Sequence, residues 1–121
     1  MASILVIDDD NDLRTVICAI LEDEGYQVNE ACDGGEGLDR FRAKPSDLVL
    51  TDLIMPGQEG VETILELRKE FPEVRIIAMS GGGRSEPGSF LGFANKLGAT
   101  DTLEKPFSRD KLLDTIAKVL N

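Results

Sequence analysis

The chain has 121 residues, of which 41% are hydrophobic and 30% are charged, a composition typical of one compact globular domain. Its 23 acidic residues outnumber its 13 basic residues, and the formal net charge of −10 disfavours direct binding to nucleic acid or to an anionic membrane surface. The chain contains no histidine, which excludes Ser-His-Asp and Cys-His catalysis, histidine-containing zinc sites and a phosphohistidine of its own.

The cysteines and the hydrophobic segments indicate the cell compartment. Cys18 and Cys32 form no CxxC pattern and are too few for a disulfide scaffold, so we expect reduced structural thiols. No apolar run approaches the ~20 residues of a membrane-spanning helix, and no apolar leader opens the chain. We therefore expect a cytoplasmic protein without membrane insertion.

Buried strands and amphipathic helices are predicted in alternation, beginning at the N-terminus. A strand is predicted at residues 3–7, because its uninterrupted apolar run at 4–7 is typical of a strand covered on both faces. Asn11 or Asp12 can cap the helix that follows, and Gly25 can end it. The inward-facing positions of this helix, at helical spacing, are Leu13, Val16, Ile17, Ile20 and Leu21.

The same alternation continues to the C-terminus. Further strands are predicted at 26–31, 47–51, 74–79 and 102–104, and further helices at 36–42, at 61–70, around 90–97 and after the capping residue Ser108. Three glycines at 81–83 predict a flexible loop. Five strand-helix pairs without a linker predict a single α/β domain over residues 1–121, with a doubly wound parallel sheet between two layers of helices.

Polar residues at the predicted strand ends define a candidate site. In a doubly wound sheet the site lies at the carboxyl ends of the strands, which share one edge. The candidates at that edge are Asp8, Asp9, Asp10, Asp52, Ser80 and Lys105; of the nearby acids, Asp10 and Asp12 are assigned to helix capping and surface charge. Clustered carboxylates without histidine or cysteine favour Mg²⁺, and a metal beside a lysine and a hydroxyl suits phosphoryl transfer to a carboxylate of the protein.

The order and spacing of these residues resemble a known family. Asp8 and Asp9 follow the first strand, Asp52 precedes a Met-Pro-Gly turn at 55–57, Ser80 follows an apolar strand, and Lys105 precedes Pro-Phe. In this pattern the chain resembles, over residues 4–120, the receiver domain of two-component response regulators, and in particular single-domain chemotaxis regulators. The resemblance implies a flavodoxin-like three-layer α/β/α sandwich with strand order 2-1-3-4-5, and we expect residues 1–121 to be one receiver domain without an output domain.

The resemblance also implies a phosphorylation site and a Mg²⁺ site. Asp52 corresponds to the phosphoacceptor. Asp9 and Asp52 correspond to direct Mg²⁺ ligands, Asp8 to a ligand that acts mainly through water, and the backbone carbonyl of Ile54 to the remaining protein ligand.

Three further positions correspond to the phosphoryl contact and the switch of receivers. Lys105, with a cis bond to Pro106, corresponds to the lysine that contacts the phosphoryl group, and Ser80 to the hydroxyl that moves toward it. Thr102 stands at a switch position where receivers often carry an aromatic residue, so the resemblance does not extend to the usual coupled rotation of hydroxyl and aromatic ring. We expect the response to phosphorylation to be concentrated in residues 80–90.

The partners implied by the resemblance are proteins. The phosphodonor is a histidine kinase or a histidine phosphotransfer protein, and a downstream protein partner binds the last two helices and the strand between them. Such a chain is a phosphoacceptor switch, which assists its own phosphorylation and dephosphorylation, rather than an enzyme. Direct nucleic-acid binding is not expected.

Two alternatives remain open at this point. Residues 4–10 also fit the strand and Asp-x-Asp motif of a haloacid-dehalogenase-like phosphatase, with Asp8 as nucleophile and Asp10 as acid or base. The other alternative is a receiver-like module that binds its partner without phosphorylation.

Overall fold

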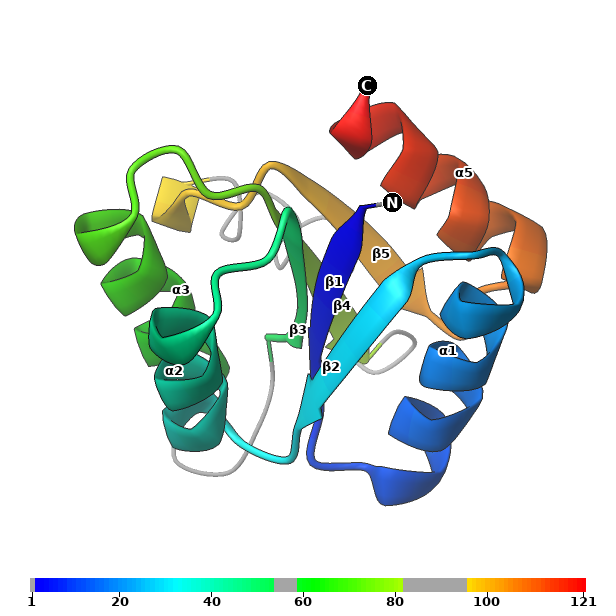
Figure 1. The fold of residues 1–121 in the computed structure, drawn as a ribbon, viewed down its shortest axis with the longest axis horizontal. Coiled ribbons are helices and arrows are strands. Elements are labelled where there is room, and N and C mark those ends of the chain that lie inside the picture. Colours follow the sequence, from blue (N-terminus) through cyan, green and yellow to red (C-terminus); the bar gives the residue numbers. More distant parts are fainter. Residues whose placement is uncertain (1, 54–58, 82–95) are drawn as a thin grey trace.

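The computed structural model describes residues 2–53, 59–81 and 96–121 and contains a five-stranded sheet (Figure 1). The strands are β1 (Ser3–Ile7), β2 (Gln27–Ala31), β3 (Leu48–Asp52), β4 (Ile76–Gly81) and β5 (Asp101–Lys105). Neighbouring strands are parallel, in the order β2-β1-β3-β4-β5. The predicted topology is confirmed.

Helices cover both faces of this sheet. The described helices are α1 (Asn11–Asp23), α2 (Gly34–Ala43), α3 (Glu59–Glu70) and α5 (Arg109–Leu120). Helices α2 and α3 lie on one face, and α1 and α5 lie on the other, which gives the predicted three layers (Figure 1). The predicted glycine loop at 81–83 and the helix predicted around 90–97 fall mostly outside the described residues. No helix in the described part of the chain is long and apolar enough to cross a membrane.

The hydrophobic core consists of two clusters, one on each face of the sheet. In β1, Leu5 and Ile7 belong to the cluster under α2 and α3, whereas Ile4 and Val6 belong to the cluster under α1 and α5. Successive residues of a strand point to opposite faces, so a central strand between two helical layers must be hydrophobic at every position. This requirement explains the uninterrupted apolar run of residues 4–7.

The caps of the helices refine the predicted boundaries. Asp10, rather than Asn11 or Asp12, caps α1, because its side chain accepts the hydrogen bond from the Leu13 N–H. Helix α2 begins at Gly34, two residues before its predicted start, because Asp33 caps it. Ser108 caps α5, as predicted.

The strands reach further toward the candidate site than predicted. Strand β3 ends at Asp52 and β5 ends at Lys105, and β4 begins at Ile76 rather than at residue 74 and continues through Ser80. Backbone pairing places Asp52 opposite Met79. The sheet itself therefore fixes the backbone of these three candidate residues.

Helix α1 confirms its predicted end and corrects one core position. Gly25, with φ of 98°, follows the helix in a conformation that glycine adopts without steric cost. Val16 was predicted to face the core, but it is 54% exposed. The buried residues of α1 are Ile17, Cys18 and Leu21, a narrow stripe that leaves Val16 at the side of the contact.

Candidate functional site

Asp8 is a buried carboxylate at the carboxyl edge of the sheet. It directly follows β1, and its side chain has 0% exposure. Its Oδ1 accepts a hydrogen bond from the Asp10 N–H at 2.9 Å, and its Oδ2 accepts one from Lys105 Nζ at 3.0 Å. Burial of a charged group is unfavourable unless the group is paired and hydrogen-bonded, and these two bonds supply both requirements.

Lys105 joins Asp8 to Asp52. Its Nζ lies 3.1 Å from Oδ2 of Asp52, whose side chain is 7% exposed, while the side chain of Lys105 is 18% exposed. Burial alone lowers the pKa of Lys105, but the charge of Asp52 and the hydrogen bond to Asp8 outweigh it, so that the pKa is raised above its ordinary value of 10.5. The ammonium group is thus held in its charged form. The Lys105–Pro106 peptide bond is cis, as expected.

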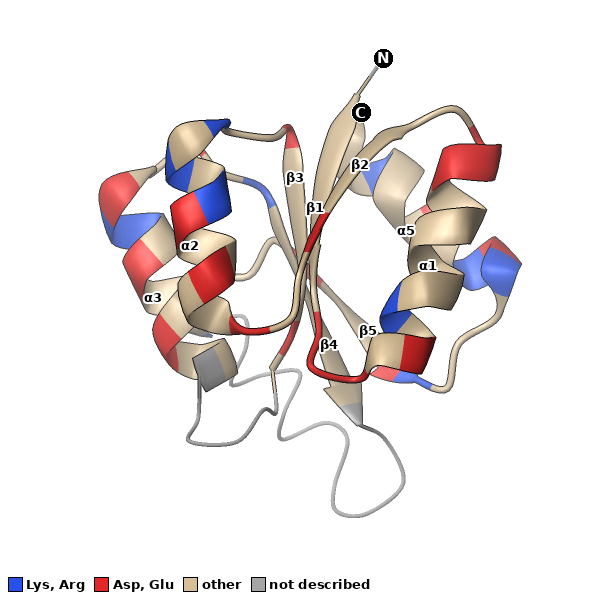
Figure 2. Ribbon diagram, turned by 60° about the horizontal axis from the view of Figure 1, so that its bottom comes forward, with Lys and Arg blue, Asp and Glu red and all other residues tan. Residues whose placement is uncertain are grey.

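Asp9 completes an acidic cluster with Asp8 and Asp52. Each of the three offers one carboxylate oxygen, and these oxygens lie within 4.8 Å of one another. Figure 2 shows the acidic segment that follows β1 and the acidic end of β3 on the same edge of the sheet. Lys105 balances one of the three negative charges.

The donor set of this cluster fits Mg²⁺. Ligand oxygens around an octahedral Mg²⁺ lie about 3–4 Å apart, since each bond is about 2.1 Å long. The three carboxylate oxygens lie within 4.8 Å of one another, close to this range. A divalent cation also balances the two negative charges that Lys105 leaves. The residues that could hold the ion are therefore Asp8, Asp9 and Asp52.

Ser80 directly follows Met79, the residue of β4 that pairs with Asp52. The residue is 3% exposed, and its Oγ has no hydrogen-bond partner among the described residues. Leaving a buried hydroxyl unpaired costs about 1–3 kcal/mol, so such groups are rare in folded proteins. A hydroxyl that is available at the same edge as the carboxylates can donate to an oxyanion bound there.

Thr102 shares a sheet face with Ser80 but lies further from the edge. Strand β5 pairs Thr102 with Ala78 and pairs Glu104 with Ser80. Paired residues of parallel strands point to the same face of the sheet. Thr102 therefore points to the same face as Ser80, but it lies two residues further from the carboxyl edge than Glu104, the residue paired with Ser80. Ile54, predicted to supply a backbone carbonyl, lies outside the described residues.

Two contacts of the site were not predicted from the sequence. A Cβ atom at Gly60, the second residue of α3, would collide with the backbone carbonyl oxygens of Asp52 and Leu53. The start of α3 therefore packs directly on the backbone that carries the candidate phosphoacceptor. The other contact is a hydrogen bond from Arg14 Nη1 to the backbone carbonyl of Asp8 at 2.6 Å. Gly60 stands directly before the helix predicted at 61–70, and helix α3 begins two residues earlier than predicted, at Glu59.

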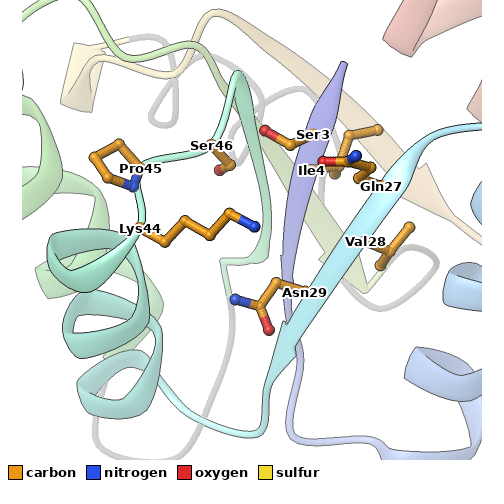
Figure 3. Close-up of a pocket in the computed structure, with 8 residues that line it drawn as sticks. All are labelled: Ser3, Ile4, Gln27, Val28, Asn29, Lys44, Pro45 and Ser46. Carbon is orange, nitrogen blue, oxygen red and sulfur yellow. The ribbon is translucent and has the colours of Figure 1, made fainter. Parts of the chain in front are cut away.

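A polar pocket of about 250 Å³ lies at the opposite edge of the sheet (Figure 3). It is formed at the starts of β1 and β2 and by the segment between α2 and β3, and the side chain of Lys44 extends toward the strands (Figure 3). No residue of the acidic cluster lines it. The lining residues are Ser3, Ile4, Gln27, Val28, Asn29, Lys44, Pro45 and Ser46.

The two cysteines are free thiols, and the pKa of each is raised although the charge of Arg14 acts to lower it. Cys18 is buried, and burial raises its pKa to about 11. Cys32 is exposed, and its hydrogen bond with Glu36 raises the pKa of its thiol. A raised pKa reduces the fraction of reactive thiolate at neutral pH, which agrees with structural roles for both residues.

Comparison with known proteins identifies the family. The sequence profile of the response regulator receiver domain matches residues 4–117. This chain belongs to the response regulator receiver family. Its sheet order and acidic edge are those expected from the sequence, and the match favours the receiver over the phosphatase alternative. Asp10, the acid or base of that alternative, instead caps α1.

Relatives include both short and long proteins. The chain is 34% identical over 119 residues to the chemotaxis protein CheY of Bacillus subtilis, covering 98% of this chain and 97% of that protein. It is 35% identical over 115 residues to a putative response regulator NtrX-like protein of Rickettsia bellii, covering 93% of this chain but 23% of that protein. The chain thus spans about a quarter of the length of relatives of the second kind.

Solved structures show the same fold. A CheY-like receiver domain protein from Methanospirillum hungatei superposes with a TM-score of 0.88 at 32% sequence identity, covering 99% of this chain and 94% of that one.

Proposed function

We propose that the receiver domain accepts a phosphoryl group on Asp52 from a phosphohistidine of a histidine kinase or histidine phosphotransfer protein. The chain has no histidine, so the donor is a second protein. The observation that carries the proposal is the position of Lys105 Nζ, 3.0 Å from Asp8 and 3.1 Å from Asp52. One cation thereby connects a candidate nucleophile to a candidate metal ligand at the edge where doubly wound folds bind their ligands.

The proposed transfer uses the side chains of this edge. A carboxylate oxygen of Asp52 attacks the phosphorus in line while the bond from phosphorus to the histidine nitrogen breaks, which leaves an aspartyl phosphate. Lys105 donates to the oxygens of the transferred group. Ser80, whose Oγ has no hydrogen-bond partner among the described residues, donates its hydroxyl hydrogen to one of them.

The proposed cofactor is Mg²⁺, held by Asp8, Asp9 and Asp52 together with the backbone carbonyl of Ile54. When bound, Mg²⁺ neutralises negative charge that develops on the phosphoryl oxygens. Asp8 and Asp52 are fixed by their bonds to Lys105, whereas the exposed Asp9 is free to rotate toward the ion.

The proposed output is a change in binding to a downstream protein. Ser80 and Thr102 lie on the same sheet face, and we propose that movement of Ser80 toward the phosphoryl group changes the packing near β5. In this proposal the chain is a phosphoacceptor switch rather than an enzyme that turns over an external substrate. Its free thiols agree with a cytoplasmic location.

Intact-mass spectrometry after incubation with Mg²⁺ and phosphoramidate tests the proposal. We expect one phosphoryl group on the wild-type protein, none on Asp52→Asn, and none after chelation of the metal. Asp47→Asn, which alters an acid at the other edge of the sheet, is the matched control and should be phosphorylated normally. An adduct on Asp52→Asn, or none on a wild-type protein that binds Mg²⁺, would contradict the proposal.

A further inference from the structure

Arg14 connects three elements close to the acidic cluster. It lies in the first turns of α1, its side chain is 13% exposed, and its guanidinium group makes two hydrogen bonds. Nε donates to Oε1 of Glu30 on β2 at 2.8 Å, and Nη1 donates to the backbone carbonyl oxygen of Asp8 at 2.6 Å. The side chain thus ties the end of β1 to both α1 and β2.

The accepting carbonyl belongs to the peptide group between two candidate metal ligands. The Asp8 C=O is part of the peptide bond to Asp9, so its orientation sets the direction in which the Asp9 backbone leaves the sheet. The Asp8 side chain is fixed independently by the Asp10 N–H and by Lys105. The Asp9 carboxylate is exposed and accepts no hydrogen bond in the part of the chain that the structure describes. Its position therefore depends on the backbone that Arg14 holds.

We infer that Arg14 is a positioning residue for the metal site, and that Glu30 orients it. The inference rests on the proposed Mg²⁺ site. Residues that orient the ligands of a metal contribute to its affinity without contacting the ion, and their loss weakens binding by about 10–100-fold. Arginine suits this position because its planar group presents two donors in fixed, diverging directions, whereas lysine is a single point charge.

The positioning role and simple electrostatics predict opposite changes in Mg²⁺ affinity for Arg14→Gln. Arg14→Gln removes a positive charge from beside a negatively charged cluster, and on electrostatic grounds alone Mg²⁺ should then bind more tightly. If the orientation of the Asp8–Asp9 peptide group is what Arg14 supplies, Mg²⁺ should bind more weakly. The sign of the change in affinity therefore separates the two roles.

Isothermal titration calorimetry with Mg²⁺ alone measures this sign on the unphosphorylated chain. We expect the Kd of Arg14→Gln to rise about 10-fold. Arg14→Lys, which keeps the charge but cannot make both bonds, should also bind more weakly than the wild type. Glu30→Gln keeps the acceptor oxygen for Nε and should bind Mg²⁺ nearly as the wild type does.

The matched control is Arg40→Gln. Arg40 also connects a helix to β2, through Asn29, and pairs with Glu36, but it makes no contact with the acidic cluster. We expect its Kd for Mg²⁺ to stay within about twofold of the wild-type value. Circular dichroism at the titration temperature establishes that each variant is folded, and Arg14→Lys provides a milder change should Arg14→Gln unfold.

The outcomes separate this inference from the proposed function. Unchanged or tighter Mg²⁺ binding by Arg14→Gln overturns the inference, and so does full affinity in Arg14→Lys. A wild-type protein that binds no Mg²⁺ overturns it together with the metal site. If wild-type protein binds Mg²⁺ but Asp52 is not phosphorylated, the proposed function fails, while the affinity ratio still decides the role of Arg14.

Discussion

The two edges of the sheet carry polar side chains in contrasting environments. At the carboxyl edge, Asp8, Asp52 and Lys105 are largely withdrawn from water, and Lys105 donates hydrogen bonds to both carboxylates. At the amino edge, Asp47 accepts hydrogen bonds from the N–H and the hydroxyl of Ser3 at 2.8 and 3.3 Å in an exposed setting. One pocket of about 250 Å³ lies at the amino edge and another of the same volume lies between α2 and α3, whereas the buried charges are at the carboxyl edge.

This contrast shows why buried charged residues indicate a functional site better than a surface pocket does. Exposed polar groups are satisfied by water and cost little, so their presence on a surface requires no functional explanation. Buried carboxylates beside a lysine are unfavourable unless the fold holds them in place. The carboxyl edge is therefore the part of the molecule where the fold keeps buried charged groups at a cost in stability, as a functional site requires.

The largest effect on stability should come from the lysine of the carboxyl edge. Lys105→Met leaves Asp8 and Asp52 without their shared cation, and we expect the free energy of unfolding to fall by about 3 kcal/mol. Lys44→Met, at the exposed pocket of the other edge, should change it by less than about 0.5 kcal/mol. Urea denaturation measures the free energy of unfolding of both variants. Equal losses in the two variants would contradict the claim that buried charge matters more at the carboxyl edge.

The effect of Lys105 should also depend on pH with a definite sign. Burial lowers its pKa, but Asp52 and Asp8 raise it more, so that the pKa in the folded state exceeds 10.5. A lysine whose pKa is higher in the folded state contributes its full stabilisation at pH values below its pKa in the unfolded chain. This stabilisation is lost as the pH rises through its pKa in the folded state. The stability difference between wild type and Lys105→Met should therefore narrow above about pH 10.5.

Mg²⁺ should stabilise the folded chain through the acidic cluster. At a free concentration 100 times its Kd, a ligand specific for the folded state adds about 2.7 kcal/mol. Asp9→Asn, which removes the exposed ligand, should lose most of this gain, whereas Asp12→Asn, on the surface of α1, should keep it. Thermal unfolding with and without Mg²⁺ measures the gain; an equal gain in Asp9→Asn would argue against binding by the cluster.

Gly60→Ala should disturb the carboxyl edge through the backbone. Its Cβ would meet the carbonyl oxygens of Asp52 and Leu53, so we expect a loss of about 2 kcal/mol and slower phosphorylation of Asp52. Gly35→Ala is the matched control in α2, because its Cβ would lie 3.5 Å from Asp33 Oδ1, an ordinary contact. The control should be neutral or stabilise by about 0.5 kcal/mol. Denaturation and intact mass together distinguish the two glycines.

The smallest effect is expected at the amino edge. Asp47→Ala removes the acceptor of two exposed hydrogen bonds from Ser3 and should cost about 1 kcal/mol. Phosphorylation at saturating Mg²⁺ should proceed at the wild-type rate, as followed by intact mass over time. A large loss of phosphorylation in this variant would place the amino edge in the function.

The fold was predictable because its strands have a hydrophobic pattern that few architectures can bury. Residues 4–7 and 48–50 are apolar at every position, which requires helices on both faces of the sheet. The ends of the strands were less predictable. Asp52 and Lys105 are polar, but backbone pairing with Met79 and Gly81 extends the strands to include them.

The acidic cluster was predictable from the same topology, whereas its supports were not. Parallel strands bring their carboxyl ends together, so Asp8 and Asp52 could be expected to meet although they are far apart in the sequence. The contacts of Arg14 and Gly60 depend on how closely a helix approaches the sheet, and no residue pattern encodes that distance. Val16 shows the same difficulty, because helical spacing identifies an apolar face but not how wide a stripe of it is covered.

Chemical trapping of the phosphoryl group tests most directly whether the carboxyl edge carries the function. Borohydride reduces the acyl carbon of an aspartyl phosphate to a primary alcohol and releases phosphate, which converts the phosphorylated aspartate into homoserine. After incubation with Mg²⁺ and phosphoramidate, peptide mass spectrometry should find homoserine at position 52 and at no other aspartate. Homoserine at position 8, or a stable phosphoryl adduct elsewhere in the chain, would contradict the assignment of Asp52.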